Sequence, residues 1–188
     1  MRKESGFSLL EMLVAILILG ILGAFAVVRF SSYIAEDQLQ KAAWKVMADL
    51  SMTRSMAMKN DCQILVTFPT NNQYTIIIDS TNNSVADAGE YQQVFTLDPP
   101  VRFGLPETSP GSAASGADLP AAGSWLGGNW ADKGMIVSKD AMGSINPGSL
   151  YLSSSKLPKV TYCIAILNTG STQNLRMFKW DGSSWIAL

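Results

Sequence analysis

A single carboxylate at the start of a long apolar run is the feature of this chain best placed to do chemistry. Residues 5–11 read Ser-Gly-Phe-Ser-Leu-Leu-Glu, and the run from Met12 to Val28 contains no charged residue. A charge at the centre of a membrane helix costs about 2.5–3.5 kcal/mol on insertion scales. We therefore expect Glu11 to have a functional partner. The alternative is a glutamate that extends to the lipid headgroups.

The stretch Gly6-Phe7-Ser8-Leu9-Leu10-Glu11 resembles the processing site of type IV prepilins and type II secretion pseudopilins. The resemblance implies cleavage between Gly6 and Phe7 by a prepilin peptidase, followed by N-methylation of Phe7 by the methyltransferase. It also implies that Glu11 pairs with the terminal amine of Phe7 in a neighbouring subunit. The expected partners are other pilin or pseudopilin subunits, the peptidase and an inner-membrane assembly platform.

The apolar segment is long enough to cross a membrane. Phe7 to Val28 is 22 residues with one charge, and a helix of that length spans roughly 33 Å against a bilayer core of about 30 Å. Arg2 and Lys3 precede it, so the positive-inside rule places the N-terminus in the cytoplasm and the rest of the chain in the periplasm. The expected location is the inner membrane, in contact with lipid, before assembly into a pilus or pseudopilus.

Two simpler interpretations of this segment explain less. A secretory signal peptide has an apolar core of about 7–15 residues and an Ala-x-Ala-like cleavage site, which Gly20 to Ala24 matches poorly. A plain membrane anchor would account for the length but not for Glu11 or for a glycine directly before an aromatic residue.

No proline precedes Pro69 in this chain, whereas many major pilins have a proline near the end of the apolar segment. The pattern therefore favours a minor subunit.

The composition gives little support to catalysis. The chain has no histidine, which removes the commonest general base and metal ligand, and it contains no P-loop, dinucleotide fingerprint or Gly-x-Ser-x-Gly elbow. We expect no enzyme activity, no cofactor and no metal. Without residues 1–6 the chain has 12 basic and 14 acidic side chains, a net charge of about −2, which does not favour nucleic acid as a partner.

Helical periodicity continues past the membrane segment. One helical face is apolar over the residues Leu39, Ala43, Val46, Leu50, Thr53 and Ala57. Asn60-Asp61 is the predicted end of the helix, so one helix is expected from Phe7 to about Lys59. The predicted organisation is a leader (1–6), a transmembrane assembly helix (7–28) and a periplasmic domain (29–188), the last divided into an amphipathic helix (29–60) and a β-rich part (62–188).

The remainder of the chain is predicted to be β-structure. The expected strands are 63–68, 74–79, 94–97, 101–103, 135–138, 150–153, 161–167, 176–180 and 184–187. Pro69–Gln73 is expected to be a hairpin loop, and Asp181-Gly182 a hairpin turn. Gly104–Gly134 is rich in Gly, Ala, Ser and Pro and is predicted to be a loop, with Trp125 and Trp130 able to pack back on the sheet. The fold class is α+β, a long N-terminal helix packed on an antiparallel β-rich domain.

This order of elements resembles the pilin fold, and the strand pattern is similar to GspH/FimT-like minor pilins and pseudopilins. The resemblance implies a structural subunit of a type IV pilus or a type II secretion pseudopilus, two systems that share the N-terminal device. FimT-like subunits suggest an alternative, DNA binding for uptake, for which the candidate cations are Lys156, Lys159, Arg176 and Lys179. A membrane-anchored periplasmic enzyme is a further alternative, and a deep pocket with a perturbed carboxylate would favour it.

Cys62 and Cys163 are the only cysteines. An oxidising periplasm permits a disulfide between them, but neither their spacing nor a motif decides between a bond and two buried thiols.

Overall fold

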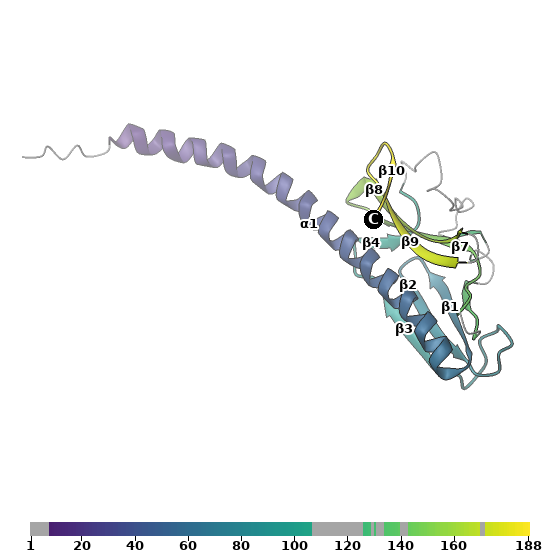
Figure 1. Ribbon diagram of the computed structural model, residues 1–188. Coiled ribbons are helices and arrows are strands. Elements are labelled where there is room, and N and C mark those ends of the chain that lie inside the picture. Colours follow the sequence, from purple (N-terminus) through teal and green to yellow (C-terminus); the bar gives the residue numbers. More distant parts are fainter. Residues whose placement is uncertain (1–7, 107–125, 129, 131–133, 140–142, 170–171) are drawn as a thin grey trace, which may run out of the picture.

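The computed structural model describes residues 8–106, 126–128, 130, 134–139, 143–169 and 172–188. In this part of the chain a single long helix is followed by strands, and every strand pairing is antiparallel (Figure 1). The helix projects far beyond the β-structure at its N-terminal end and lies against it at its C-terminal end. The α+β fold predicted from the sequence is confirmed.

Helix α1 runs from Leu9 to Asn60, 52 residues, which corresponds to about 78 Å. It ends where Asp61 adopts the left-handed conformation, with φ 51° and ψ 40°. The backbone N–H of Cys62 then donates to the carbonyl of Ala57 at 3.4 Å, which caps one of the carbonyls left over at a helix end. The predicted stop at Asn60-Asp61 is confirmed.

The C-terminal half of α1 is buried on one face. The six residues predicted for that face are all fully buried: Leu39, Ala43, Val46, Leu50, Thr53 and Ala57. The one polar member, Thr53, donates its hydroxyl to the carbonyl of Leu50 at 2.6 Å, so its burial leaves no hydroxyl unsatisfied. The apolar spacing in the sequence thus positions the helix against the sheets.

A four-stranded sheet lies beside the C-terminal end of α1 in the order β3-β2-β1-β6. Its strands are β1 (Gln63–Thr70), β2 (Gln73–Asp79), β3 (Gln92–Thr96) and β6 (Met135–Val137). β1 and β2 pair as far as Thr70 and Gln73, so the hairpin turn is shorter than the loop predicted over Pro69–Gln73.

The second sheet has the order β10-β9-β8-β7-β4, and β5 also pairs with β7. Its strands are β4 (Val101–Phe103), β5 (Leu126–Gly128), β7 (Gly148–Ser154), β8 (Leu157–Thr169), β9 (Thr172–Trp180) and β10 (Trp185–Ala187). β8 and β9 are longer than the predicted strands and pair from Thr161↔Trp180 to Thr169↔Thr172. Long central strands of this kind are stabilised by neighbours on both sides.

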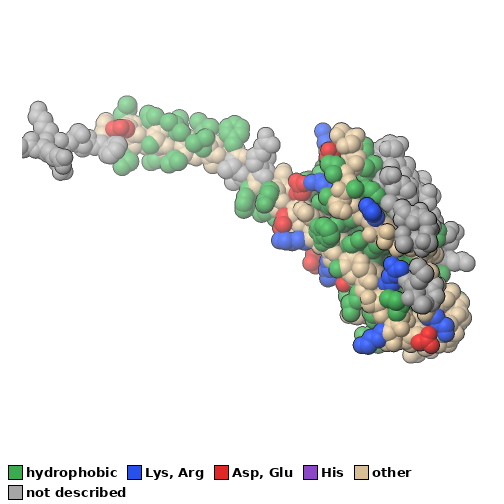
Figure 2. Space-filling view, in the orientation of Figure 1, with side chains coloured by type: hydrophobic (Ala, Val, Ile, Leu, Met, Phe, Trp, Pro, Cys, Tyr) green, Lys and Arg blue, Asp and Glu red, His purple; other side chains and the backbone are tan. Residues whose placement is uncertain are grey.

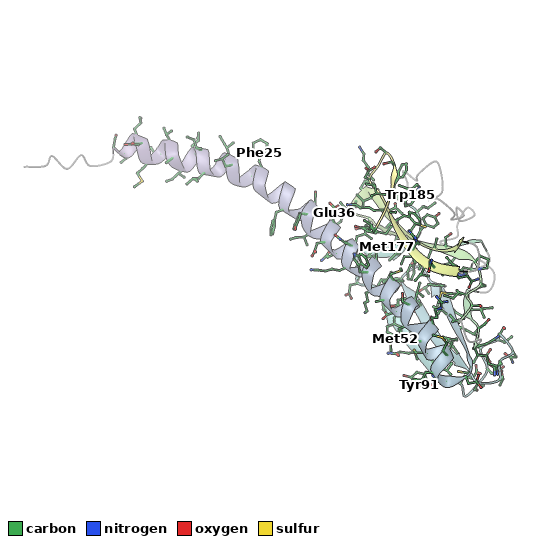
Figure 3. All side chains as sticks on the ribbon, in the orientation of Figure 1. Phe25, Glu36, Met52, Tyr91, Met177 and Trp185 are labelled. Carbon is green, nitrogen blue, oxygen red and sulfur yellow. The ribbon has the colours of Figure 1, made fainter. Side chains whose placement is uncertain are left out.

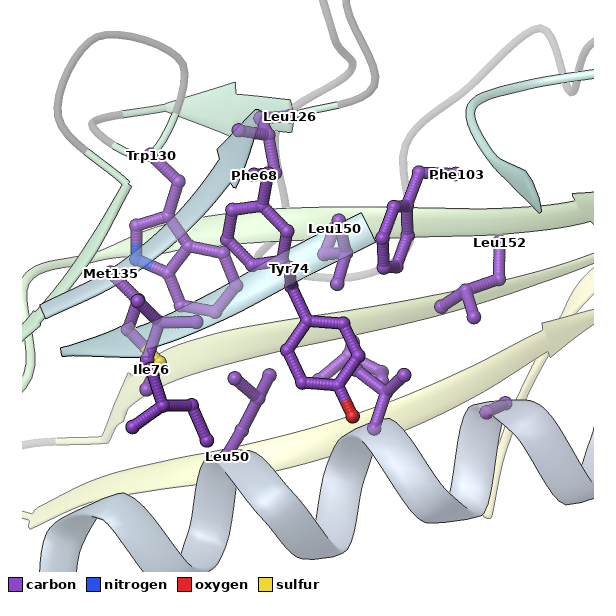
Figure 4. Packing of buried hydrophobic residues seen from close by; sticks show 14 of the residues in the cluster. Leu50, Phe68, Tyr74, Ile76, Phe103, Leu126, Trp130, Met135, Leu150 and Leu152 are labelled. Atoms are coloured by element: carbon purple, nitrogen blue, oxygen red, sulfur yellow. The ribbon is translucent and has the colours of Figure 1, made fainter. Parts of the chain in front are cut away.

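The core fills the space between α1 and the two sheets (Figure 4). Phe103 and Phe68 meet edge to face with ring centroids 5.5 Å apart. Trp130 is fully buried and donates its indole N–H to the carbonyl of Asn146 at 2.8 Å. A Cβ on Gly148 would lie 2.2 Å from the Trp130 ring, so this position in β7 requires glycine.

The prediction of a loop over Gly104–Gly134 is wrong at one place, because β5 lies inside it. Gly127 and Gly128 have low intrinsic strand preference, and their strand exists because β7 offers a partner, with Leu126 opposite Leu150. Trp130 packs back on the core as the sequence allowed, whereas Trp125 lies outside the described residues.

Candidate assembly surface

The N-terminal part of α1, from Leu9 to Phe25, packs against no other described part of the chain. Every described side chain from Ser8 to Phe25 is exposed, and Phe30, Tyr33 and Ile34 are exposed as well. Figure 2 shows apolar side chains covering this part of the helix. The segment is long and apolar enough to cross a membrane. An apolar helix exposed all round is stable in lipid or among similar helices, not in water.

Glu11 lies in the first turn of α1 and is exposed. A carboxylate is favourable in a first helical turn because the unpaired N–H groups there carry partial positive charge. Among the described residues Ser8 to Phe25, Glu11 is the one charged side chain. Gly6 and Phe7 lie outside the described residues, so cleavage between them and the pairing of Glu11 with the Phe7 amine remain predictions.

An ion pair joins α1 to the second sheet at the point where the helix meets the domain. Ala35 is the first buried residue among the side chains of the helix that the structure describes. The next residue, Glu36, accepts a hydrogen bond from Lys179 Nζ in β9 at 2.5 Å. That contact raises the pKa of the Lys179 amine. The sequence does not predict this pair, because the two residues are far apart in the chain and nothing local to either position indicates the other.

The possible disulfide between Cys62 and Cys163 is not formed, since both thiols are free and buried. Cys62 follows the end of α1 and packs in the main core. Cys163 lies in β8 and packs with Tyr151, Ala165 and Phe178 in a separate cluster. Burial raises the pKa of Cys163 to about 12, which keeps it an inert thiol.

The four cations that the DNA-binding alternative depended on do not share one face. Lys156 lines a shallow pocket with Phe30 and Gln38 of α1. Lys179 reaches α1 through Glu36. Arg176 lies opposite Ala165, which packs in the cluster on the face of the sheet away from α1. Lys159 lies beside Gly182 in the β9–β10 turn. A phosphate backbone is bound by cations gathered on one surface, and this arrangement does not provide that surface.

A groove beside α1 has a volume of about 250 Å³ and is lined by Gln38, Lys41, Ala42, Lys45, Thr96, Leu97, Asp98, Pro99 and Val101. Its charged members are two lysines and one aspartate. Lys41 forms an exposed ion pair with Asp37 at 2.6 Å, and the Lys45 ammonium lies 5.9 Å from the centre of the Phe95 ring. The groove therefore offers a shallow cationic and apolar surface rather than a paired acid and base.

Comparison with known proteins gives three matches. Residues 1–27 match the family described as the prokaryotic N-terminal methylation motif. Over 98 residues the chain is 26% identical to two proteins of Pseudomonas aeruginosa, each named "Fimbrial protein"; the match covers 52% of this chain and 62% of theirs. The minor pseudopilin EpsH from the type 2 secretion system of Vibrio cholerae has a similar structure, with a TM-score of 0.46 and 15% identity over 73% of this chain and 95% of that one.

The methylation motif and the fimbrial relatives confirm the resemblance of the N-terminus to prepilins. The chain spans about three fifths of the length of those fimbrial relatives.

Proposed function

We propose that this chain is a minor pilin or pseudopilin, a structural subunit held in the inner membrane by α1 and assembled through it into a type IV pilus or a type II secretion pseudopilus. The observation that carries the proposal is the exposure of every described side chain of α1 from Leu9 to Phe25, within the stretch that matches the methylation motif. Such a surface is compatible with lipid before assembly and with a bundle of the same helices afterwards.

Cleavage of the leader would create a positively charged amine that can pair with the Glu11 carboxylate. Cleavage between Gly6 and Phe7 removes the leader and leaves an amine on Phe7, which is then methylated. A carboxylate and an ammonium each have an unfavourable free energy when alone in lipid. Pairing between adjacent subunits offsets both of these costs. Glu11 is exposed in the first turn of α1, so a neighbouring chain can approach it. The pair would also fix the axial register of the two helices.

The charge distribution supports an orientation with the N-terminus in the cytoplasm. Arg2 and Lys3 precede the apolar helix, and cations are retained on the cytoplasmic side. The β-domain then lies in the periplasm, where a packed surface can meet other subunits. The peptidase and an inner-membrane assembly platform are the partners that processing and assembly require.

Substitution of Glu11 tests the proposal. We expect Glu11→Ala to insert and to be cleaved, because removing the charge eases insertion, but to enter fibres poorly, because the Phe7 amine loses its partner. Glu11→Asp keeps the charge and serves as the matched control, with partial incorporation expected. Quantifying the subunit in sheared fibres and in membranes gives the readout. Incorporation of Glu11→Ala at the wild-type level would contradict the proposed role.

A further inference from the structure

A shallow pocket lies where α1 enters the β-domain. It has a volume of about 290 Å³ and is lined by Phe30, Ser31, Ile34, Ala35 and Gln38 of α1 and by Lys156 of the turn between β7 and β8. In Figure 3, Phe25 lies on the projecting part of the helix, and Glu36 lies where the helix meets the domain. The pocket is therefore at the end of the domain that directly follows the apolar part of α1.

The spacing along α1 sets the level of this pocket relative to a bilayer. The apolar run ends at Val28, and Phe30 and Ile34 lie about 3 and 9 Å beyond it along the helix axis. The headgroup layer extends roughly 5–7 Å beyond each side of the hydrocarbon core. With the run from Phe7 to Val28 across the core, the pocket opens into the headgroup layer. This step rests on the proposed function.

The lining of the pocket combines apolar and polar groups. Phe30 and Ile34 are 65% and 41% exposed, and Gln38 and Lys156 are exposed as well. Lys156 takes part in neither of the ion pairs found among the described residues, and the described lining includes no acidic side chain. The ammonium of Lys156 and the amide of Gln38 are hydrogen-bond donors. This lining favours an anion that also has an apolar part.

The turn that carries Lys156 is fixed by its backbone. The N–H of Lys156 donates to the hydroxyl oxygen of Ser154 at 3.3 Å, and the N–H of Ser155 donates to the carbonyl of Pro100 at 3.3 Å. The next residue, Leu157, packs against the main core. The backbone position of Lys156 is thus set, and its long side chain can cover apolar surface while its ammonium reaches a headgroup.

Two glycines lie on the helix face below the pocket. Gly23 precedes Phe30 by seven residues and Gly20 precedes Gln38 by eighteen, which are about two and five helical turns. A Cβ on either glycine would meet no atom within 4 Å. The missing side chains leave a shallow lane on an otherwise apolar helix surface, and this lane leads from the pocket into the apolar segment. An acyl chain that enters the bilayer from the pocket can follow it.

We propose that the pocket binds one anionic phospholipid of the leaflet next to the β-domain, with its phosphate at Lys156 and an acyl chain along Phe30 and the two glycines. The lipid holds the domain against the membrane surface before the subunit enters a fibre. A single headgroup phosphate needs one cation, whereas a nucleic-acid backbone needs a row of them. The site therefore agrees with the scattered positions of the other lysines.

Lipid retention by the full chain tests the pocket. The chain in detergent is titrated with dioleoylphosphatidylglycerol or with dioleoylphosphatidylcholine, which has the same acyl chains and no net charge. Native mass spectrometry counts the bound lipids. The variants are Lys156→Ala and, as the matched control, Lys59→Ala, which removes an exposed lysine from the last turn of α1. Arg2 and Lys3 are present in every chain, so a difference between chains reports the substituted lysine.

We expect Lys156→Ala to bind phosphatidylglycerol about fivefold more weakly than the unsubstituted chain, which is the contribution of one lysine near an anionic lipid surface. Its binding of phosphatidylcholine should be unchanged, and Lys59→Ala should match the unsubstituted chain. No loss in Lys156→Ala, or an equal loss in both variants, would overturn the site. A large excess of inorganic phosphate should leave the lipid bound; displacement would assign the site to a free anion and overturn the lipid proposal.

A label beside the pocket tests its level in the membrane. A Ser155→Cys chain carries a fluorophore on the new thiol and is reconstituted in phosphatidylglycerol vesicles that contain a lipid with a nitroxide headgroup. The native thiols are buried, so the unsubstituted chain reports background labelling. Strong quenching is expected at residue 155. A label that is not quenched there would overturn the proposal.

The control label is at Val85→Cys. Val85 is exposed and lies in the loop after Asp79, which pairs with Gln63 just past the C-terminal end of α1. In Figure 3, Tyr91 at the end of the same loop lies at the far end of the domain from Glu36. Little quenching is expected at residue 85. Equal quenching at residues 85 and 155 would mean that the domain lies flat on the membrane, which contradicts a site at its base.

Substitution of a glycine tests the path of the acyl chain. Gly23→Leu fills the lane and should weaken the binding of both lipids, whereas Ala15→Leu adds a similar side chain on another face of the same helix and should not. Unchanged binding by Gly23→Leu would overturn the acyl-chain path. Mass analysis of the N-terminus on the same preparations separates the two proposals. A chain cleaved at Gly6 that shows no effect of Lys156→Ala refutes the lipid site and leaves the proposed function standing.

Discussion

The two halves of α1 belong to one continuous helix but face different surroundings. From Ser8 to Phe25 all described side chains are exposed, although nearly all are apolar. From Ala35 to Ala57 a single face is fully buried, and its opposite face carries exposed side chains such as Trp44 and Met52. The first half is suited to contact with lipid or with other apolar helices, whereas the second half packs into the core of its own domain.

The difference shows that an apolar side chain is not always buried within its own chain. A helix that is apolar all round must find partners outside its own fold, and an amphipathic helix finds them within it. The transition lies at Glu36, where the ion pair with Lys179 marks the start of the packed half. Substitutions in the two halves should therefore affect different measurements.

The largest effect on stability is expected for Leu50→Asp. Leu50 is fully buried, and the variant loses its apolar contacts and buries an unpaired charge, so the free energy of unfolding should fall by about 3–5 kcal/mol. Met52→Asp is the matched control, because Met52 is 60% exposed and should change little. Thermal unfolding of the full chain in detergent gives the comparison. Equal melting temperatures for the two variants would mean that this half of α1 is a stalk and not part of the core.

The counterpart in the first half is Leu17→Asp. Leu17 is 64% exposed in the isolated chain, so the melting temperature of the domain should stay unchanged. Membrane insertion should instead weaken by about 2.5–3.5 kcal/mol, because a second carboxylate enters the apolar helix. The fraction of chain that resists carbonate extraction from membranes measures this, with Leu17→Ala as the control. A lower melting temperature for Leu17→Asp with normal insertion would reverse the assignment of the two halves.

An alkaline transition should be confined to the packed half. Burial, together with the hydrogen bond to Asp49 on α1, raises the pKa of the Tyr74 phenol well above its usual value. A raised pKa contributes stability that is complete below the unfolded value near pH 10 and is lost as the pH rises further, by about 1.4 kcal/mol per pH unit. Tyr74→Phe should be less stable at neutral pH but show a shallower decline above pH 10, measured by denaturant unfolding. An equally steep decline in Tyr74→Phe would assign the transition to other groups.

The smallest effect is expected at the junction between the halves. Glu36→Gln removes an ion pair whose side chains are 41% and 26% exposed, and solvent screening limits the loss to below about 1 kcal/mol. Asp37→Asn removes the more exposed pair with Lys41 and should cost less still. Melts at low and high salt distinguish the two, since the Glu36 pair is more buried and less screened. A larger loss for Asp37→Asn would contradict this ranking.

Most structural features that depend on the local spacing of apolar and turn residues could be predicted from the sequence. The buried helix face, the end of α1 at Asn60-Asp61 and the positions of nearly all strands follow from spacing and turn residues. What it did not predict depends on distant parts of the chain. β5 has two glycines and exists because β7 pairs with it, the Glu36–Lys179 pair joins residues without a local signal, and the two cysteines are kept apart by their places in separate clusters. The prepilin-like N-terminus was recognisable because six adjacent residue types define it.

The mature N-terminus tests the central claim most directly. The full chain, produced in membranes that contain a prepilin peptidase, is purified, and the mass of its N-terminal peptide is measured. The account predicts a chain that begins at Phe7 with one added methyl group on its amine, and a Gly6 substitution to a bulky residue that leaves the leader attached. An intact Met1 in the presence of active peptidase, or a new terminus near residue 24, would contradict the account.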